Sequence, residues 1–460
     1  MDDPLQFDER LGAAQRGVPN PVALSRQIAA AATDYRAWYE RLRDDPDCED
    51  DPLGPYRSVA GRTLFRDLEQ LGGHDPLRIY LKRWVWCLAE RRVNAGLQRR
   101  LRYARHHERV SVSGEAAPCS LASLLLGALQ RPASAAHLLQ HYFQQSHSLA
   151  RQNCLLWERR AELVRRWGVV GYAPIGEADP SGPSQWSAVS SARAWLERTQ
   201  DMAREYQCAS PTAWIEQALA HDAQLDWPGR LNWRTLCEWF AEGDLLTALR
   251  LGSKRLPERI APASFLRGVA RLGEEWSQAL APADQFFVVA QDPFRVRPHM
   301  HAALFAGLLL NGAFLRRSLA ADPTRLRTAL RPLLRTVLLE SRVRAFKVVM
   351  ADAAQQGWSV LQESFTEETQ LRFGFHLPPP AAGTLLSPGD DCAAALAGLM
   401  LAAVQSEALA LSHDEDWFRN PRGIDQLRSE AALPPALAVE ADVIQRGSDL
   451  LYAKLAAGLG

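Results

Sequence analysis

The stretch His301–Leu319, HAALFAGLLLNGAFLRRSL, decides the fold class because it is apolar on nearly every side until its last residues. A helix at the surface of a globular protein keeps a polar face toward water, so a helix that lacks one must be buried. The sequence therefore predicts a central buried helix over residues 302–320, with other helices packed around it.

Amphipathic helices that can cover this centre lie on both sides of it. In the segment 74–92 the apolar residues recur at spacings of four, three and four, which places them on one helix face: Leu77, Leu81, Trp84 and Leu88. Asp75 can cap this helix and Pro76 occupies its first position. Asp322 and Pro323 repeat that start for a long helix that we expect to end before Gly357.

The fold class predicted from these patterns is mostly α, a large multi-helix body with one or two short β segments. Residues 286–290 (FFVVA) and 371–376 (LRFGFH) are the two segments with β-strand character. Proline, glycine and serine are concentrated in residues 173–187, APIGEADPSGPSQWS. We therefore expect an N-terminal helical domain over residues 1–172, a linker over 173–187, and a C-terminal helical domain over 188–460 that contains the central helix.

Composition and charge restrict the possible partners and the compartment. The 53 acidic residues balance the 53 basic ones, so the chain offers no electrostatic basis for binding nucleic acid or an anionic membrane. The longest apolar run, Cys392–Val404, is shorter than the roughly 18 residues that a membrane span needs. Seven dispersed cysteines and an acidic N-terminus without signal-peptide layout indicate a soluble protein of the reducing cytoplasm.

The motifs of several enzyme classes are missing, and no cofactor is predicted. The chain contains no phosphate-binding Gly-x-x-x-x-Gly-Lys-Ser/Thr loop, no Gly-x-Gly-x-x-Gly and no Gly-x-Ser-x-Gly. His137 and His141 would share one helix face and are the best candidate metal ligands, but Leu138 stands where a zinc hydrolase needs a glutamate. Two histidines on a semi-polar helix face are the preferred interpretation, and no metal site is predicted.

Three other groups of residues are candidate ligand-binding side chains. Four arginines of the long helix fall on about one side of it and are able to line a groove for a carboxylate, a phosphate or an acidic partner: Arg327, Arg331, Arg335 and Arg342. His299 and His301, just before the central helix, are a second group. Trp417 and Arg419, in the turn HDEDWFRNPRG, are a third, although Asn420 and Pro421 mark that turn mainly as the start of the next helix.

The order of features between residues 75 and 430 resembles that of the helical zinc metallopeptidases of the thimet oligopeptidase and oligoendopeptidase type. The long N-terminal helices, AWLERT, the FFVVA segment before a buried helix and WFRNPRGIDQLRSE near the end carry the resemblance. The zinc chemistry of that family depends on His-Glu-x-x-His, which this chain lacks: the nearest case, His107-Glu108, has Ser111 in the last place. The resemblance implies a relative without catalytic zinc, and no zinc ligand is carried over.

These observations favour a non-catalytic helical binding or scaffold protein, a degenerate metallopeptidase-like body that binds a peptide or protein partner. Two alternatives remain open: an enzyme of unrecognised class with an arginine-lined pocket, and a structural subunit of a larger complex. In the first alternative the arginine stripe and the two histidines would line the pocket. In the second, some of the fourteen tryptophans would form an aromatic interface.

Overall fold

The computed structural model describes residues 20–42, 45, 51–71, 75–112, 117–168, 186–206, 211, 214–215, 262–280, 286–319, 323–387, 391–433 and 439–459. The predicted linker 173–187 lies outside these residues except for Trp186 and Ser187, so the division into two domains stays a prediction. Within the described residues the chain is mostly α-helical, and the predicted fold class is confirmed.

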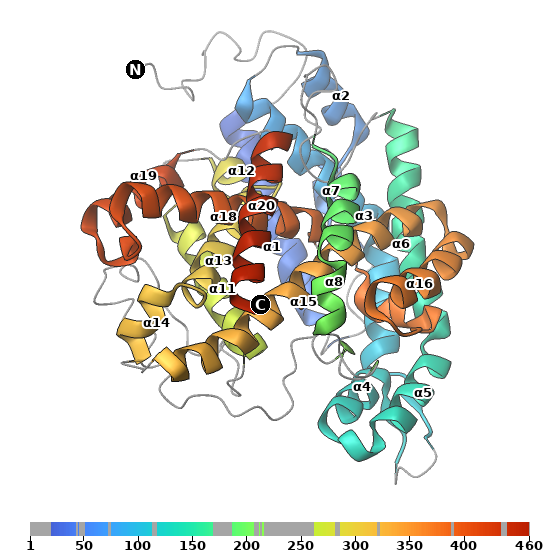
Figure 1. Cartoon of the computed structure of the whole chain (residues 1–460). Helices are drawn as coiled ribbons and strands as arrows, with labels where there is room; N and C mark the ends of the chain where they lie inside the picture. Colours follow the sequence, from blue (N-terminus) through green and yellow to red (C-terminus); the bar gives the residue numbers. More distant parts are fainter. Residues whose placement is uncertain are drawn as a thin grey trace.

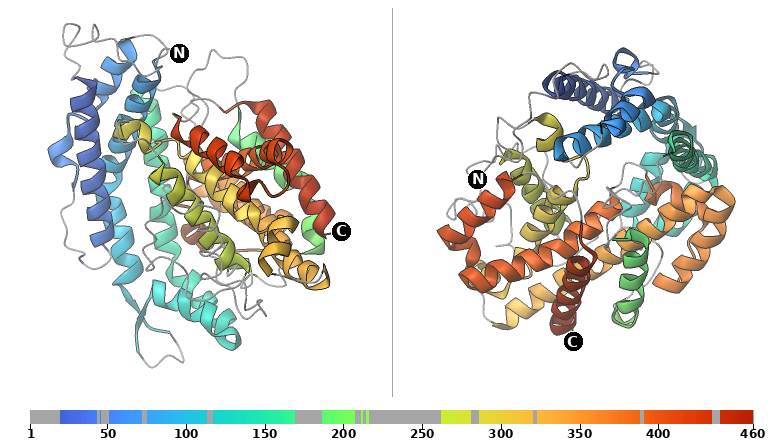
Figure 2. Two further views of the ribbon diagram at one scale, coloured as in Figure 1. Left: turned by 90° about the vertical axis from the view of Figure 1, so that its left-hand side faces the viewer. Right: turned by 90° about the horizontal axis from the view of Figure 1, so that it is seen from above.

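The N-terminal part forms a layer of long helices along one side of the molecule (Figures 1 and 2). It consists of α1 (Pro21–Arg41), the short helices η2 (Gly54–Tyr56) and α2 (Arg62–Gln70), α3 (Pro76–His106) and α6 (His147–Trp167). As predicted, Asp75 caps α3 by accepting a hydrogen bond from the Leu77 N–H, and Pro76 is its first residue. At one end of this layer lie η3 (Pro132–Ser134), α4 (Leu121–Gln130) and α5 (Ala135–Gln145).

The C-terminal helices pack against this layer. They are α7 (Ala188–Arg198), α8 (Gln200–Glu205), α11 (Pro262–Ala279), α12 (Phe287–Ala290), α13 (Val296–Leu308), α14 (Gly312–Leu319), α15 (Pro323–Gln356), α16 (Trp358–Phe373), η5 (Pro379–Ala381), α17 (Ala382–Leu385), α18 (Cys392–His413), η6 (Trp417–Arg419), α19 (Pro421–Ala432) and α20 (Ala441–Leu459). The long α15 and the apolar α18 cross the middle of the molecule in Figure 1.

The β segments are real but lie elsewhere than predicted. Among the described residues one sheet is present, in which β1 (Arg109–Val110) pairs antiparallel with β2 (Cys119–Ser120). Residues 287–290 instead form α12, because Val288 and Val289 are buried against α1 and α3 and the indole N–H of Trp84 donates to the Val288 carbonyl at 3.0 Å. Residues 371–373 end α16, and Gly374 closes it in the left-handed conformation.

The predicted single helix over 302–320 is also wrong in one respect, because the structure divides it in two. α13 ends at Leu308, and α14 begins at Gly312 after a sharp turn. The Asn311 side chain causes the new start: its Oδ1 accepts hydrogen bonds from the N–H groups of Ala313 and Phe314. Asn311 and Gly312 therefore begin a new helix, and the apolar residues on both sides of them led to the prediction of one continuous helix.

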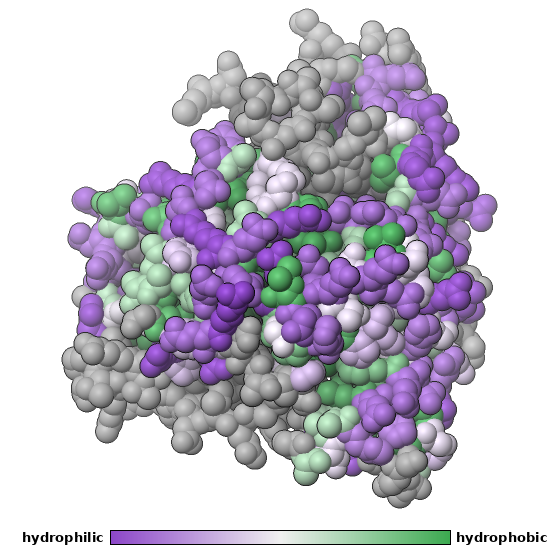
Figure 3. Space-filling model, turned by 45° about the vertical axis from the view of Figure 1, so that its right-hand side comes forward, coloured by the Kyte–Doolittle hydropathy of each residue, from purple (hydrophilic) through white to green (hydrophobic). Residues whose placement is uncertain are grey.

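Buried apolar residues form two clusters. One contains residues of α1, α2 and most of α3 together with Leu163, Val288 and Val289, and the other extends from Ala104, near the end of α3, to Leu459. Trp38 and Trp86 are buried in the first cluster, and Trp195 and Trp276 in the second. Among the coloured residues of Figure 3, hydrophilic ones predominate and hydrophobic ones show in patches between them.

Three glycines bring four helices of the second cluster into close backbone contact. Gly273 of α11 and Gly398 of α18 face the backbone of α13, and Gly447 of α20 faces the backbone of α18. A Cβ atom would lie 2.4 Å from the His301 carbonyl oxygen at Gly273, 2.7 Å from the Met300 nitrogen at Gly398, and 2.1 Å from the Met400 carbonyl oxygen at Gly447. No side chain fits at these distances, so α11, α13, α18 and α20 pack in this order only with glycine at all three positions.

α18 is long and apolar enough to cross a membrane by length and composition, the one such helix in the described part of the chain. It exceeds the run Cys392–Val404 because the helix continues to His413. In the structure it packs against α13, α15 and α20. Length and composition do not separate a core helix from a membrane span, and the prediction that this chain has no membrane partner stays a prediction.

Replacing Gly447 by alanine should lower the free energy of unfolding by about 2–3 kcal/mol, because its Cβ would force α20 away from α18. Gly307→Ala is the matched control: a Cβ there meets no atom within 4 Å, and alanine is the better helix former by about 1 kcal/mol. Equilibrium urea unfolding of both variants measures the difference. Equal stabilities would contradict the close packing of α18 and α20.

Candidate functional site

A cavity of about 520 Å³ lies beside α13, enclosed by α11, α13, α14, α15, α18 and α20. Most of its wall is aliphatic: Leu266, Leu304, Leu310, Val337, Leu399, Leu450 and Leu451. Its volume falls within the range of about 300–1,000 Å³ that is typical of small-ligand sites. The cavity therefore lies directly beside the first half of the predicted central helix.

Small residues on two helices keep this space open. α13 contributes Ala302, Ala303, Ala306 and Gly307, and α18 contributes Ala402, Ala403 and Ala410. These positions follow, in both helices, the point where Gly398 touches the backbone of α13 at His299 and Met300. Larger side chains on these two faces would fill the volume, so the alanine and glycine content of the two helices produces the cavity.

The carboxylates of the cavity already have cationic partners. Glu340 lies 3.1 Å from Arg267 and 3.6 Å from Arg344, and it is 12 % exposed. Glu407 pairs with Arg446, and Glu415 lies 3.9 Å from Arg316. Negative charge at the wall is therefore compensated by the protein itself.

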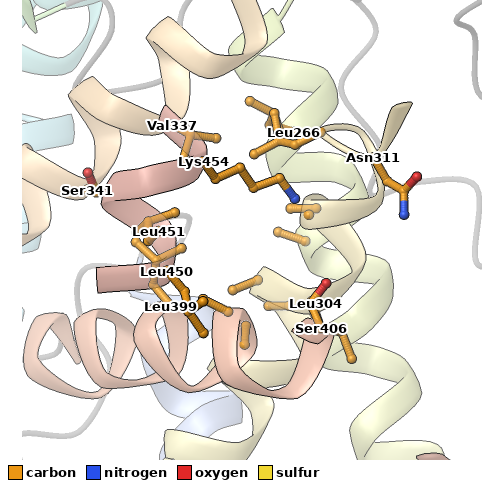
Figure 4. Close-up of a pocket in the computed structure, with 18 of the residues that line it drawn as sticks. Leu266, Leu304, Asn311, Val337, Ser341, Leu399, Ser406, Leu450, Leu451 and Lys454 are labelled. Atoms are coloured by element: carbon orange, nitrogen blue, oxygen red, sulfur yellow. The ribbon is translucent and has the colours of Figure 1, made fainter. Parts of the chain in front are cut away.

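Lys454 is different from these paired groups. It extends from α20 into the space between that helix and the helices that carry Leu266 and Leu304 (Figure 4). Its ammonium has no hydrogen-bond or ion-pair partner in the described part of the chain. The surrounding protein removes part of its hydration and lowers its pKa, although the side chain still reaches water. An uncompensated cation beside an aliphatic wall suits a ligand with an anionic head and an apolar body.

Of the two predicted histidines, only His299 lines the cavity. Its Nε2 atom is buried and has no partner in the described residues. Burial, with Arg295 and Arg344 nearby, lowers the pKa of His299 to about 3, so its imidazole is neutral at pH 7. His301, two positions on in the same helix, instead packs edge-on against Trp276 at 5.2 Å. The helix sends the two side chains in different directions, and they do not converge.

Arg331, Arg335 and Arg342 of the predicted stripe do not line this cavity. Arg342 is fully buried and donates to the carbonyls of Leu196 and Arg372 and to the side chains of Thr199 and Gln200, at 2.7–2.9 Å. Burial, more than the nearby Arg372, lowers the pKa of Arg342 to about 10. Arg331 and Arg335 are exposed, and Arg331 donates to the Tyr206 hydroxyl at 3.1 Å.

The Arg327 side chain lies outside the described residues. Ligand binding by the stripe stays a prediction, although Arg342 itself is occupied in joining α15 to α7 and α16.

The remaining predicted residues form two separate groups, one on α5 and one in η6. His137 and His141 stack edge to face on α5 with ring centres 4.6 Å apart, and no group of three potential metal ligands occurs among the described residues. Trp417 is buried and lines the cavity, whereas Arg419 is exposed. The turn around them is built as its sequence indicates: Asn420 caps α19 through the Arg422 N–H, and Pro421 is the first residue.

No protein-family model matches this chain, and no curated protein matches it. The site therefore has to be judged on its own geometry. Lys454 was missed in the sequence because a lysine in a helix is ordinarily solvated. The sequence does contain one indication: Lys454 is the single cation within the apolar run LLYAKLAAGL.

Arg342→Met should lower the free energy of unfolding by about 3 kcal/mol, because it leaves several buried acceptors without a donor. Arg335→Met, on the same helix but exposed, should change it by less than about 0.5 kcal/mol. Chemical unfolding of both variants makes the comparison. A neutral Arg342→Met variant would contradict a structural role for this guanidinium.

Acid should destabilise the protein through His299. Its folded pKa of about 3 lies below the unfolded value near 6.5, so the unfolded state binds the proton first and stability falls as the pH falls. Between pH 7.5 and pH 5.5 this amounts to about 1.4 kcal/mol. His299→Gln should reduce the loss over that interval by this amount in urea unfolding at both pH values. His137→Gln, at an exposed position outside the cavity, is the control variant in the same measurement.

Proposed function

We propose that this chain is a non-catalytic helical binding protein, and that the cavity beside α13 takes the apolar C-terminal segment of a peptide or protein partner. The single observation that supports this best is Lys454, an unpaired cation at an aliphatic cavity of about 520 Å³. A peptide C-terminus with aliphatic side chains combines the two features such a site needs, a carboxylate and an apolar body.

The wall supports binding by burial of apolar surface. Each methylene of a ligand that leaves water for an aliphatic wall contributes about 0.8 kcal/mol, so two leucine-sized side chains supply most of the affinity. The space beside Ala303, Ala306 and Gly307 is open, so it need not be created by moving a helix. A preformed cavity saves the ordering that would otherwise reduce the affinity.

The charges at the cavity support an anionic terminus in particular. Glu340, Glu407 and Glu415 are each paired with arginine, which leaves Lys454 as the unpaired charge of the described lining. A carboxylate at Lys454 completes the pairing. His299, being neutral at pH 7, adds a polar contact without adding charge.

The resemblance to the helical zinc metallopeptidases fits this proposal, because a relative of that family can keep the helical body and lack the zinc site. The zinc motif is missing from the sequence, and His299 and His301 of α13 point to different sides of that helix. In such a relative the helical body would keep a place for a peptide and lose the groups that activate water. We propose this kinship together with the binding function.

The proposal is tested with a fluorescent peptide that ends in Leu-Leu and carries either a free carboxylate or a C-terminal amide. Fluorescence anisotropy should show the free acid binding roughly fivefold more tightly than the amide, as expected for one partly exposed ion pair. Lys454→Gln should remove this preference and leave the amide's affinity unchanged. Lys82→Gln, which removes a lysine paired with Glu69 away from the cavity, should preserve the preference.

Gly307→Leu gives a second, steric test, because its side chain would occupy the cavity. It should abolish binding of both peptides, whereas Gly307→Ala should retain it. Stoichiometric zinc in the purified protein together with hydrolysis of the peptide would overturn the non-catalytic function. Equal affinity of acid and amide for the wild-type chain would overturn the assignment of the carboxylate to Lys454.

A further inference from the structure

A second cavity, of about 810 Å³, lies where the N-terminal helices face α15 and the start of α18. Its lining comes from both core clusters: Tyr35 and Arg83 belong to the N-terminal layer, and Ala393 and Ala394 to α18. The right-hand view of Figure 2 shows the N-terminal helices on one side of this region and α18 on the other. The site is separate from the cavity beside α13 and goes beyond the function proposed above.

The lining of this second cavity carries an excess of positive charge. Five arginines, Arg83, Arg91, Arg160, Arg165 and Arg295, line it together with three carboxylates, Glu90, Asp352 and Asp391. Arg160 lies 3.5 Å from Glu90, and Arg295 lies 2.8 Å from Asp391. The lining therefore holds two more arginines than carboxylates, although Arg295 also pairs with Glu274 outside the lining and Arg165 is exposed to water.

Arg91 is held in place by aromatic rings and not by a carboxylate. Its guanidinium lies over the rings of Tyr35 and Trp84, at 5.2 and 5.8 Å from their centres, and no carboxylate of the described residues forms an ion pair with it. Stacking on aromatic faces fixes the plane of a guanidinium and leaves its N–H groups available at the edges. Such a group is preorganised for the oxygens of an anion.

The N-terminus of α18 adds a second source of positive potential. Cys392, Ala393 and Ala394 are the first residues of this helix and line the cavity, and the N–H groups of Ala393 and Ala394 have no acceptor within the helix. Asp391 does not cap them with its side chain, because its carboxylate is directed to Arg295. The start of a helix of 22 residues therefore faces the same space as the arginines.

Two buried polar atoms in the lining also lack partners. The indole N–H of Trp157 and the Oδ1 of Asn94 form no hydrogen bond in the described part of the chain. These residues are 5 % and 2 % exposed. A buried donor and a buried acceptor without partners cost free energy, which a ligand that bonds to them would recover.

We propose that this second cavity binds a phosphomonoester, with its dianionic phosphate held by Arg91 and the N-terminus of α18, and an aromatic or apolar remainder beside Trp157 and Phe294. The anion adds negative charge to a lining in which arginines outnumber carboxylates. Phosphate oxygens accept hydrogen bonds from guanidinium edges and from helix N–H groups alike. The volume of about 810 Å³ leaves room for an organic group larger than phosphate.

Isothermal titration calorimetry of the full chain with phenyl phosphate, inorganic phosphate, succinate and acetate tests the proposal. Phenyl phosphate should bind most tightly, inorganic phosphate more weakly, and acetate not measurably. Arg91→Gln should weaken phenyl phosphate roughly tenfold, the loss expected for a charge-assisted hydrogen bond. Arg92→Gln is the matched control, because Arg92 points to Asp51 and does not line the cavity, and it should bind as the wild type does.

A variant that removes negative charge tests the electrostatic argument in the opposite direction. Asp352→Asn should tighten phenyl phosphate about threefold, because Asp352 lines the cavity and forms no ion pair in the described residues. Tighter binding of succinate than of either phosphate would overturn the phosphomonoester assignment. Equal effects of Arg91→Gln and Arg92→Gln, or no binding of any phosphate, would overturn the site. Loss of folding in Arg91→Gln is checked by circular dichroism, and Arg91→Lys, expected to bind with intermediate affinity, then replaces it.

Discussion

The architecture depends on the close backbone contact of four helices, α11, α13, α18 and α20, at three glycines. Where Gly398 touches α13 and Gly447 touches α18, even a methyl group would overlap backbone atoms. Side chains elsewhere in a core adapt to a substitution by changing rotamer, but backbone in a helix has no such freedom. These contacts set how near α13 and α18 come, and therefore where the two helices separate again.

The cavity beside α13 follows from that contact. Past the point where Gly398 meets His299 and Met300, both helices continue along the cavity, and both present alanine to each other. Helices that cross closely and carry small side chains beyond the crossing leave space that nothing on either helix fills. The space then belongs to a ligand or to water, and α20 places Lys454 beside it.

Much of the helical framework was predictable from local chemistry. Asp75-Pro76 and Asn420-Pro421 begin helices as expected, since cap and proline act through neighbouring atoms. Phe287–Ala290 was wrongly given to a strand because its β-branched residues reflect burial against α3, not strand pairing. The candidate site was harder to predict, since Lys454, His299 and Gly307 come from distant parts of the chain. Only the packing of the helices shows that these residues share a cavity.

The two cavities lower the stability of the fold in different ways. The first is mainly apolar with one unpaired lysine, and filling it with larger side chains would stabilise the core. The second holds arginines removed from bulk water, and burial lowers the pKa of Arg83. A cation withdrawn from water weakens a fold when no carboxylate pairs with it, and Arg91 forms no ion pair in the described residues. Groups that lower stability and hold no other part of the fold in place are characteristic of binding sites. Here the N-terminus of α18 adds further positive electrostatic potential. An anionic ligand at Arg91, as proposed, would supply the counter-charge that the described part of the fold does not place there.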